Sequence, residues 1–448
     1  MLSRILSRRM SRLLMPLVAL AAARSDATMG NRERQVATPA DLTAAVGDAA
    51  INDIVVTANL TGLRTIRLSP GARLRGAKST VTVRFAAGQD GVQLSSDNRL
   101  ENLELMADMD RRAIFNDTQV ESLGRLVLRN LRTTGVIQIL ARDRVRAGFV
   151  EANHVDTLAG DTRGYDDRPK GYGVEVVPGA FTLWNQQADR SITIAADLAG
   201  LTAGRPDAPV RGSGVFVSGA GAGGGRLLVR RLETGAIYTD AGIAQGTSDR
   251  IAAGVFVVSG AFVDRVVDLG PVTTYGPNDM ILDNWGTVGH WTANGKLVSH
   301  GPSGIGFVNF GTIDVLDVRS AIETFGQGSR GFNVYTGTVH RALFDRIVTH
   351  ADGAVGVQIS QPVGELTVRR GIETFGGTGD SLVKGAVVKL AAVPLSIKPG
   401  GSARKITIAG GLVSHGAGID PLELHGEVDA LQITGPVRAA GGGFGGAR

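Results

Sequence analysis

The pentapeptide Ile-Glu-Thr-Phe-Gly occurs twice, at residues 322–326 and 372–376, and a degenerate copy lies midway between them at residues 347–351. The copies are therefore spaced by 25 residues. Related segments continue the series at residues 272–276, 297–301, 412–416 and 437–441. A repeat of about 20–50 residues indicates a solenoid or a propeller, because one unit alone cannot bury its apolar face.

Each repeat has the composition of strands and turns. Runs such as Val255–Val258, Ile305–Val308 and Val355–Ile359 are rich in β-branched residues and are separated by Gly, Asn, Asp and Pro. This pattern has no helical period. A propeller blade needs about 40–50 residues, whereas 25 residues fit one coil of a parallel β-helix with three short strands. The sequence therefore predicts an all-β solenoid.

The Thr or Ser at the centre of the motif marks the register of each coil. The marks are Thr234, Thr274, Ser299, Thr324, Thr349, Thr374 and Ser414, followed by Ala439. Two intervals are 40 residues long and the others 25, which predicts insertions of 15 residues at Ala236–Arg250 and Gly377–Ala391. Because strand residues alternate between faces, each mark and the residue two before it should point inward, and the immediate neighbours of the mark outward.

A helix is expected ahead of the coils. Thr38-Pro39-Ala40-Asp41 combines an N-cap residue, a Pro in the first turn and an acid at the third position. We expect a short helix from Pro39 to Gly47 that covers the open end of the first coil, with a linker as the alternative. The coils themselves should begin near Ile54.

Residues 1–27 have the order of a signal peptide: arginines, an apolar run at Leu13–Ala23 and an Ala-rich cleavage zone. The run is too short for a membrane span, which needs about 20 apolar residues. Export to the periplasm or the exterior is expected, unless Met29 is the true start and the protein is cytoplasmic. The other expected divisions are an N-terminal segment with the cap helix at residues 28–53, the parallel β-helix at 54–443 and a Gly-rich tail at 444–448.

Composition narrows the classes of function. Cleavage after Ala27 would lower the formal net charge from +5 to +1, and the lack of a basic stripe argues against nucleic-acid binding. A near-neutral mature chain favours a neutral glycan over a strongly anionic one. The sequence contains no Cys, which excludes disulfides and thiolate sites. No motif for a cofactor or a metal is present.

The best chemical candidates form two outward columns beside the marks. The column after the marks contains Tyr275, His300, Phe325, His350, Phe375 and His415. The column before them contains Glu323 and Glu373. Coils stack about 4.8 Å apart, so His300, Glu323, His350 and Glu373 should share one face as catalytic candidates.

Two reactions fit this face. The glutamates should lie about 9–10 Å apart, near the carboxylate spacing of about 6.5–9.5 Å in inverting glycoside hydrolases. Neighbouring imidazoles, their pKa raised by the carboxylates, could donate protons. Alternatively, His300 or His350 could take a proton in a β-elimination. A ladder of side chains with a purely structural role is the third interpretation.

Substrate contacts are expected from the insertions and from aromatic rings. The insertions should wall a trough about 19 Å long beside the columns. The contact candidates are Tyr238 and Asp240 on the first insertion, Lys384 on the second, and the rings of Tyr275, Phe325, Phe375 and Trp285. Trp285 belongs to a second series with Phe310 and Tyr335, for which packing under a loop is the alternative.

The N-terminal half supports a family resemblance. The capping segment Thr38–Asn52, followed by Ile54–Leu60, Thr65–Leu74 and the run from Gly91 to Leu105, resembles the opening coils of pectate-lyase-like right-handed parallel β-helix proteins. The resemblance is architectural and covers most of the mature chain. It implies a single right-handed β-helix. Enzymes that cleave or epimerise extracellular polysaccharides dominate this superfamily, which also contains adhesins, phage spikes and trimers.

Together these observations predict an exported carbohydrate-active enzyme, a polysaccharide hydrolase, lyase or related glycan transferase, with a lateral groove between two inserted loops. Its partner would be a polysaccharide or oligosaccharide, and the resemblance allows a homotrimer. The alternative is a non-catalytic surface or structural β-helix that binds glycans or proteins.

Overall fold

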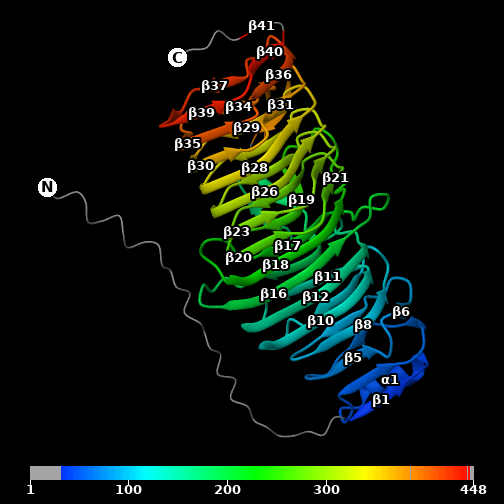
Figure 1. Ribbon diagram of the computed structural model, residues 1–448. Helices are drawn as coiled ribbons and strands as arrows, with labels where there is room; N and C mark the ends of the chain where they lie inside the picture. The colour runs from blue at the N-terminus through cyan, green and yellow to red at the C-terminus, as the bar shows by residue number, and fades with distance from the viewer. Residues whose placement is uncertain (1–31, 384, 441, 444–448) are drawn as a thin grey trace, which may run out of the picture. The chain divides into compact units, whose positions relative to one another are not determined.

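The computed structural model describes residues 32–448 except Lys384, Gly441 and residues 444–448 (Figure 1). The expected signal peptide at residues 1–27, the alternative start at Met29, the candidate Lys384 and the tail at 444–448 lie outside the described residues. The described part is nearly all β, and its strands join in long parallel sheets.

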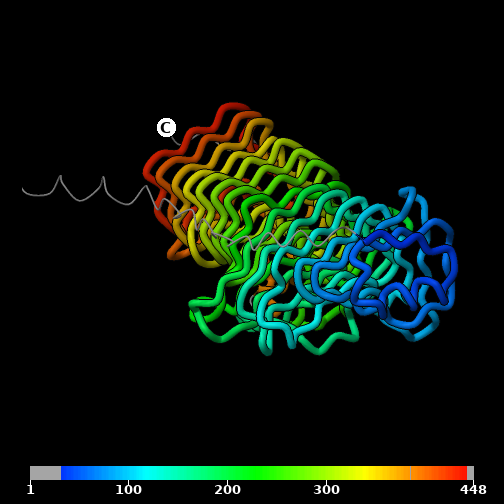
Figure 2. Tube along the Cα trace, turned by 90° about the horizontal axis from the view of Figure 1, so that it is seen from below, coloured from blue at the N-terminus to red at the C-terminus, as the bar shows by residue number. Residues whose placement is uncertain are grey.

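Each coil of the regular region has three strand segments, as predicted, although in some coils two of them join into one long strand. In one coil they are β22 (Asp279–Asn284), β23 (Thr287–Ala293) and β24 (Leu297–Ser299). Each strand pairs in parallel with its equivalent 25 residues later, so that Leu297 lies beside Ile322. Figure 2 shows successive coils following one another from the blue to the red end. The arrangement is a β-helix-like solenoid of parallel strands.

The larger sheet, sheet I, covers two faces of the coils because long strands such as β26 bend through both: the start of β26 pairs with β23 and its end with β24. Besides β23 and β24, its strands are β1 (Glu33–Val36), β2 (Asp53–Val56), β3 (Leu60–Leu63), β5 (Arg73–Gly76), β6 (Val81–Phe85), β8 (Arg99–Met106), β10 (Ser122–Thr134), β12 (Ala147–Ala159), β16 (Thr193–Ala203), β18 (Arg226–Thr239), β20 (Ala261–Asp268), β21 (Val272–Thr274), β26 (Thr312–Thr324), β28 (Thr338–Thr349), β30 (Pro362–Val368), β31 (Ile372–Thr374), β35 (Ser402–Ala409), β36 (Leu412–Ala417), β38 (Glu427–Val428), β39 (Leu431–Thr434), β40 (Val437–Ala440) and β41 (Gly442–Gly443).

The smaller sheet, sheet II, forms the remaining face. Besides β22, its strands are β4 (Ile66–Arg67), β7 (Val92–Leu94), β9 (Arg112–Asn116), β11 (Val136–Ala141), β15 (Gly179–Asn185), β17 (Ser213–Ser218), β19 (Arg250–Val257), β25 (Ile305–Asn309), β27 (Arg330–Val334), β29 (Val355–Ile359), β34 (Leu395–Ile397) and β37 (Leu422–Leu424), with the small hairpin β13 (Lys170–Gly171) and β14 (Val174–Val176) attached through β19.

The core is built from inward columns in register. The residues two before the marks, among them Leu297, Ile322 and Ile347, are buried, and so are the marks from Thr234 to Ser414; Val437 and Ala439 of the last coil are only partly buried. Their outward neighbours retain more exposure, as the 40% exposed Phe325 illustrates. This confirms the predicted alternation. Each fully buried Leu or Ile contributes about 1.5–3 kcal/mol to stability, which makes this column the main determinant of register.

The glycine of the pentapeptide permits close approach of the backbone at the turn after each mark. A Cβ atom on Gly326 would lie 1.9 Å from the carbonyl oxygen of Gly301, and one on Gly376 equally close to that of Ala351. No side chain fits at such a distance. The glycine therefore holds neighbouring turns together next to the outward columns.

The N-terminal helix α1 (Pro39–Gly47) has the predicted bounds. The side chain of Thr38 accepts a hydrogen bond from the backbone N–H of Asp41, and Leu42 is buried against the first coil. The linker alternative is therefore wrong. One detail differs from expectation: β1 precedes the helix and pairs in parallel with β2. The stack thus begins before Ile54.

The first insertion is shorter than predicted. Strand β18 continues to Thr239, which pairs with Thr274, whereas the predicted mark Thr234 pairs with Asp268. Ile237 supplies the buried inward residue beside Val272. The insertion is therefore the loop at residues 240–249, because the strand absorbs the residues before it. Tyr238 belongs to the strand and not to the loop.

The second insertion is the antiparallel hairpin of β32 (Thr378–Val383) and β33 (Ala386–Ala391), within the predicted range. It turns toward sheet II. The hydroxyl of Ser381 donates to the carbonyl of Gly328 at 2.7 Å and accepts from buried Arg330 at 2.8 Å. The hairpin therefore lies across earlier coils and does not project away from them.

A buried carboxyl fixes the base of the first insertion. Asp279 Oδ2 accepts hydrogen bonds from the backbone N–H groups of Ala241 at 3.0 Å and Gly276 at 3.1 Å. Its Oδ1 atom has no partner among the described residues. Burial raises the pKa of Asp279 from 3.8 to about 7, partly offset by the hydrogen bond from Ala241.

This environment predicts a pH-dependent stability. Between about pH 4 and pH 7 the folded state holds a proton that the unfolded state has released, so the free energy of unfolding should fall as pH rises, by up to about 1.4 kcal/mol per pH unit. Asp279→Asn should reduce this slope in chemical denaturation series, and the buried Asp268 and Asp283, whose pKa values are also raised, should supply the remainder. The control Asp314→Asn, at a side chain that is 65% exposed, should retain it. An unchanged slope in Asp279→Asn would contradict the assignment.

Candidate functional site

The outward column after the marks is a continuous stack of six rings, which we call the ring ladder. Its members are Tyr275, His300, Phe325, His350, Phe375 and His415, with successive ring centroids 5.2, 5.3, 4.4, 5.2 and 4.3 Å apart. Neighbouring rings are within 10° of parallel. The in-register backbone brings together all the ring residues predicted for this column.

The stacking limits what these rings can contact. Each inner ring has both faces covered by neighbours, so its edge is what solvent reaches. Sugar rings are bound most favourably by the flat faces of aromatic side chains. Phe325 and Phe375, 40% and 42% exposed, therefore offer edges and not the flat platforms that were expected. Only the ends of the ladder, at Tyr275 and His415, have an uncovered face in the stack.

Both predicted glutamates are held by a cation on one side and an imidazole on the other. Glu323 lies 2.5 Å from the ammonium of Lys296 and 3.1 Å from Nε2 of His350. Glu373 pairs with Arg346, and lies 2.8 Å from Nε2 of His415. The same arrangement thus occurs twice along the ladder. We call Lys296–Glu323–His350 and Arg346–Glu373–His415 the two triplets.

The triplets keep both carboxylates ionised. The hydrogen bond from Lys296 lowers the pKa of Glu323, with a further contribution from His350. Burial would raise the pKa of Glu373, but the hydrogen bonds from His415 and Arg346 outweigh it and the pKa is lowered. Inverting hydrolysis needs one carboxylic acid with a raised pKa. The electrostatics of this face do not favour that reaction.

His300 differs from the other two ladder histidines. Its imidazole makes no hydrogen bond within the described part of the chain, because the preceding coil has Thr273 where a glutamate would pair with it. Burial between its neighbouring rings lowers the pKa of His300 below 6.5, and Lys296 adds to the shift against the opposing charge of Glu323. For this imidazole the expected raised pKa is wrong. The lowered pKa favours the uncharged imidazole of His300 at neutral pH.

A phenol lies next to this base. Tyr275 stacks on His300 at 5.2 Å between ring centroids. Burial raises the pKa of Tyr275, and Tyr238 and Asp207 raise it further, so the phenol keeps its proton. Tyr238 is brought to this end of the ladder by pairing with Thr273. Asp240, the other first-insertion candidate, is engaged in an ion pair with Arg211.

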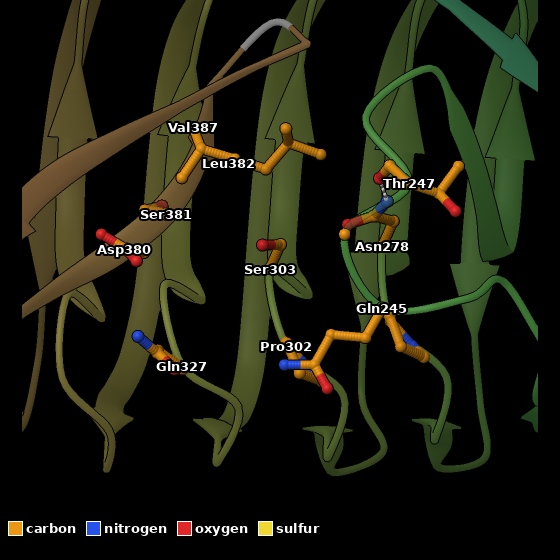
Figure 3. A pocket seen from close by; sticks show the side chains of 12 residues that line it. Gln245, Thr247, Asn278, Pro302, Ser303, Gln327, Asp380, Ser381, Leu382 and Val387 are labelled. Carbon is orange, nitrogen blue, oxygen red and sulfur yellow. Dashed lines mark hydrogen bonds between the residues drawn. The ribbon is translucent and has the colours of Figure 1, made fainter.

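The two insertions do face each other across a pocket, but the pocket is displaced from the ladder. Its volume is about 220 Å³. Figure 3 shows Gln245 and Thr247 of the first insertion opposite Ser381 and Val387 of the hairpin, with turn residues such as Ser303 beneath. Neither the predicted histidines nor the glutamates line it. Because the hairpin lies over sheet II, the space between the two insertions does not lie beside the ring ladder, where the trough was expected.

Trp285 is packed beneath a loop. It is 5% exposed, and the ring of Tyr172, from the turn between β13 and β14, meets it edge-on at 5.0 Å. Tyr172 also stacks on Phe310 at 4.4 Å. The small remaining surface of Trp285 favours the packing interpretation of this series over sugar binding.

Lys296 and Arg346 were missed by sequence reasoning, although a signal exists. Each lies three residues before a register mark, and its glutamate lies one residue before the mark of the next coil. The parallel register brings the two together. Cations at this position could have been found by aligning the repeats and comparing neighbouring coils.

Neither models of protein families, nor curated proteins, nor solved structures gave a match. In the part of the chain that the structure describes, every helix is too short or too polar to cross a membrane.

The covered environment of His300 can be tested by removing one neighbouring ring. Phe325→Ala should raise the pKa of His300 toward 6.5, because one face of the imidazole becomes hydrated. Phe375→Ala, a matched deletion in the same ladder that does not touch His300, should leave that pKa unchanged. Nuclear magnetic resonance titration of the histidine ring protons measures both. Equal shifts in the two variants would show that ring stacking does not control the titration.

Proposed function

We propose that this protein is an exported, right-handed parallel β-helix enzyme that cleaves a uronate-containing polysaccharide by β-elimination at the Tyr275 end of the ring ladder. The observation that carries the proposal is the pairing of His300, a neutral base without a hydrogen-bond partner, with Tyr275, a protonated phenol. A general base works best when it is unprotonated and free at the operating pH.

The reaction needs one proton acceptor and one proton donor. His300 would take the proton from C5 of the uronate, next to the sugar carboxylate. The electron pair of that C–H bond forms the C4–C5 double bond, and the bond from C4 to the glycosidic oxygen breaks. Tyr275 would give its proton to the departing oxygen. Proton exchange with water then returns imidazolium and tyrosinate to their starting forms.

Local charge supports an acidic sugar despite the near-neutral chain. Lys296 contributes to the electrostatics of His300 and lies 2.5 Å from Glu323. A uronate carboxylate near this ammonium would be stabilised as its α-proton leaves. In this proposal Glu323 and Glu373 position cations and imidazoles and do not exchange protons with substrate. His350 and His415 are likewise committed to the triplets. We further propose that the protein is exported, as residues 1–27 suggest, and that it forms a homotrimer, as the family resemblance allows.

A non-catalytic scaffold is the second candidate. The observation that favours it is the repetition of the triplets, which is expected if the ladder only joins coils. Under this interpretation His300 is simply a ring in the stack, and substituting it would change neither glycan turnover nor binding.

Substitutions at the two ends of the ladder separate the candidates. We expect His300→Ala and Tyr275→Phe each to reduce cleavage by at least about 100-fold, as is typical for loss of acid–base catalysis. Glu373→Gln, at the far end, should stay within a few-fold of wild type. The measurement is ultraviolet absorbance of the unsaturated product from polygalacturonate and alginate, alongside new reducing ends.

The same assay can contradict the catalytic proposal. New reducing ends without unsaturated product would indicate hydrolysis and overturn the elimination. Activity that survives His300→Ala would remove His300 as the base, and wild-type protein inactive on both polymers would favour the scaffold.

A further inference from the structure

A second cavity lies far from the ladder, on the outer face of sheet II in the first coils. We call it the N-terminal groove. Its volume is about 330 Å³. Its floor is the column Arg67, Gln93, Phe115 and Gln138, which pair in register from β4 through β7 and β9 to β11. Three coil steps separate the ends of this column, a distance of about 14 Å.

The floor of the groove has unused hydrogen-bonding groups. Gln138 is only 7% exposed, yet its amide makes no hydrogen bond to any described residue. Gln93 also lacks a partner in the described part of the chain. Arg67 is exposed and forms no ion pair with the residues that the structure describes. These side-chain amides are therefore available to the hydroxyl groups of a ligand, since they can both donate and accept hydrogen bonds.

The arginine side chains on the walls of the groove are held in place by contacts within the protein. Arg112 pairs with Asp90, and its guanidinium lies 4.1 Å above the ring of Phe115. Arg142 reaches Asp167, on the loop that follows β12, at 2.6 Å. Arg112 and Arg142 are thus ion-paired, whereas Arg67 and the other lining acid, Asp117, form no ion pair with the residues that the structure describes. A site that needs little rearrangement loses less free energy on binding.

We infer that the N-terminal groove binds a segment of an acidic oligosaccharide, with a sugar carboxylate on Arg67 and hydroxyl groups on the amides of Gln93 and Gln138. Guanidinium groups recognise carboxylates with paired hydrogen bonds, and planar amides can both donate to and accept from hydroxyls. The identity of the sugar as a uronate rests on the proposed function. The groove would hold polymer away from the reacting end of the ladder.

The groove continues beyond Arg112. An adjoining cavity of about 270 Å³ shares Asp90 and Arg112 with it and ends at Tyr165, whose hydroxyl donates to the carbonyl of Asp110 at 3.2 Å. A chain longer than the floor column could therefore continue into this cavity, which Asp110 and Asp161 line together with Arg111. This favours an oligosaccharide over a single anion.

The test uses the full chain carrying His300→Ala, so that substrate is not consumed. Isothermal titration calorimetry with a galacturonate hexasaccharide and a mannuronate hexasaccharide should show binding of at least one. Adding Arg67→Ala and Gln138→Ala should weaken it at least about tenfold, the loss expected for a charged hydrogen bond and an amide contact. Arg99→Ala, an exposed arginine on sheet I, is the matched control and should bind as before. Cellohexaose, which lacks carboxylates, should bind at least tenfold more weakly.

Three results would overturn the inference. They are binding within twofold of the control when Arg67 and Gln138 are both replaced, displacement of the hexasaccharide by inorganic phosphate at an equal concentration, and no binding of either uronate. The catalytic proposal can fail separately, since wild-type protein without elimination activity could still bind through the groove. The groove proposal can also fail alone. If Arg67→Ala changes neither the cleavage of a trisaccharide nor the binding of polymer by an active enzyme, the catalytic proposal stands and the groove is not a binding site.

Discussion

The structure depends on the stacking of identical inward positions from one coil to the next. Leu297, Ile322 and Ile347 occupy the same place in successive layers and are fully buried. A slip of one residue in any strand would turn this column to solvent, so hydrophobic burial and the parallel hydrogen bonds enforce the same register. The outward side chains inherit this order. The ring ladder and the two triplets exist because residues about 25 or 40 positions apart are forced into alignment.

The candidate chemistry lies where this order is interrupted. His350 and His415 each meet a glutamate of an earlier coil, and exposed pairs of this kind contribute at most about 1 kcal/mol. They tie neighbouring coils together and leave the carboxylates ionised. At His300 the corresponding position is Thr273, so the imidazole has no acceptor. A repeat protein can thus acquire a reactive group by losing one member of a structural set, without any change in the backbone.

Much of the fold could be predicted from the sequence, because period, turn residues and cap residues act locally. The 25-residue spacing specified three strands per coil, and Thr38 and Pro39 specified the helix. The mark at Thr234 was wrong because β18 extends through five more residues, and Ile237 takes over the buried position. Trp285 was offered as a sugar contact, but Tyr172, more than a hundred residues away, covers it. No local pattern reports such a contact. The column that contains Arg67 and Gln138 was also missed, because the first coils lack a regular period and their alignment cannot be read from local sequence.

Equal coil length has a consequence for how such a molecule can change over evolutionary time. Each layer contacts only the layers above and below, and the turns at Gly326 and Gly376 stack on the preceding turn in the same way. Duplication of one 25-residue stretch of the gene would therefore add a layer without disturbing its neighbours. The identical copies at residues 322–326 and 372–376 lie two layers apart, which is the spacing that duplication of a two-layer stretch would leave. Lengthening by whole layers would move the hairpin relative to the loop at residues 240–249 in steps of about 4.8 Å, resizing the gap between them without redesigning either.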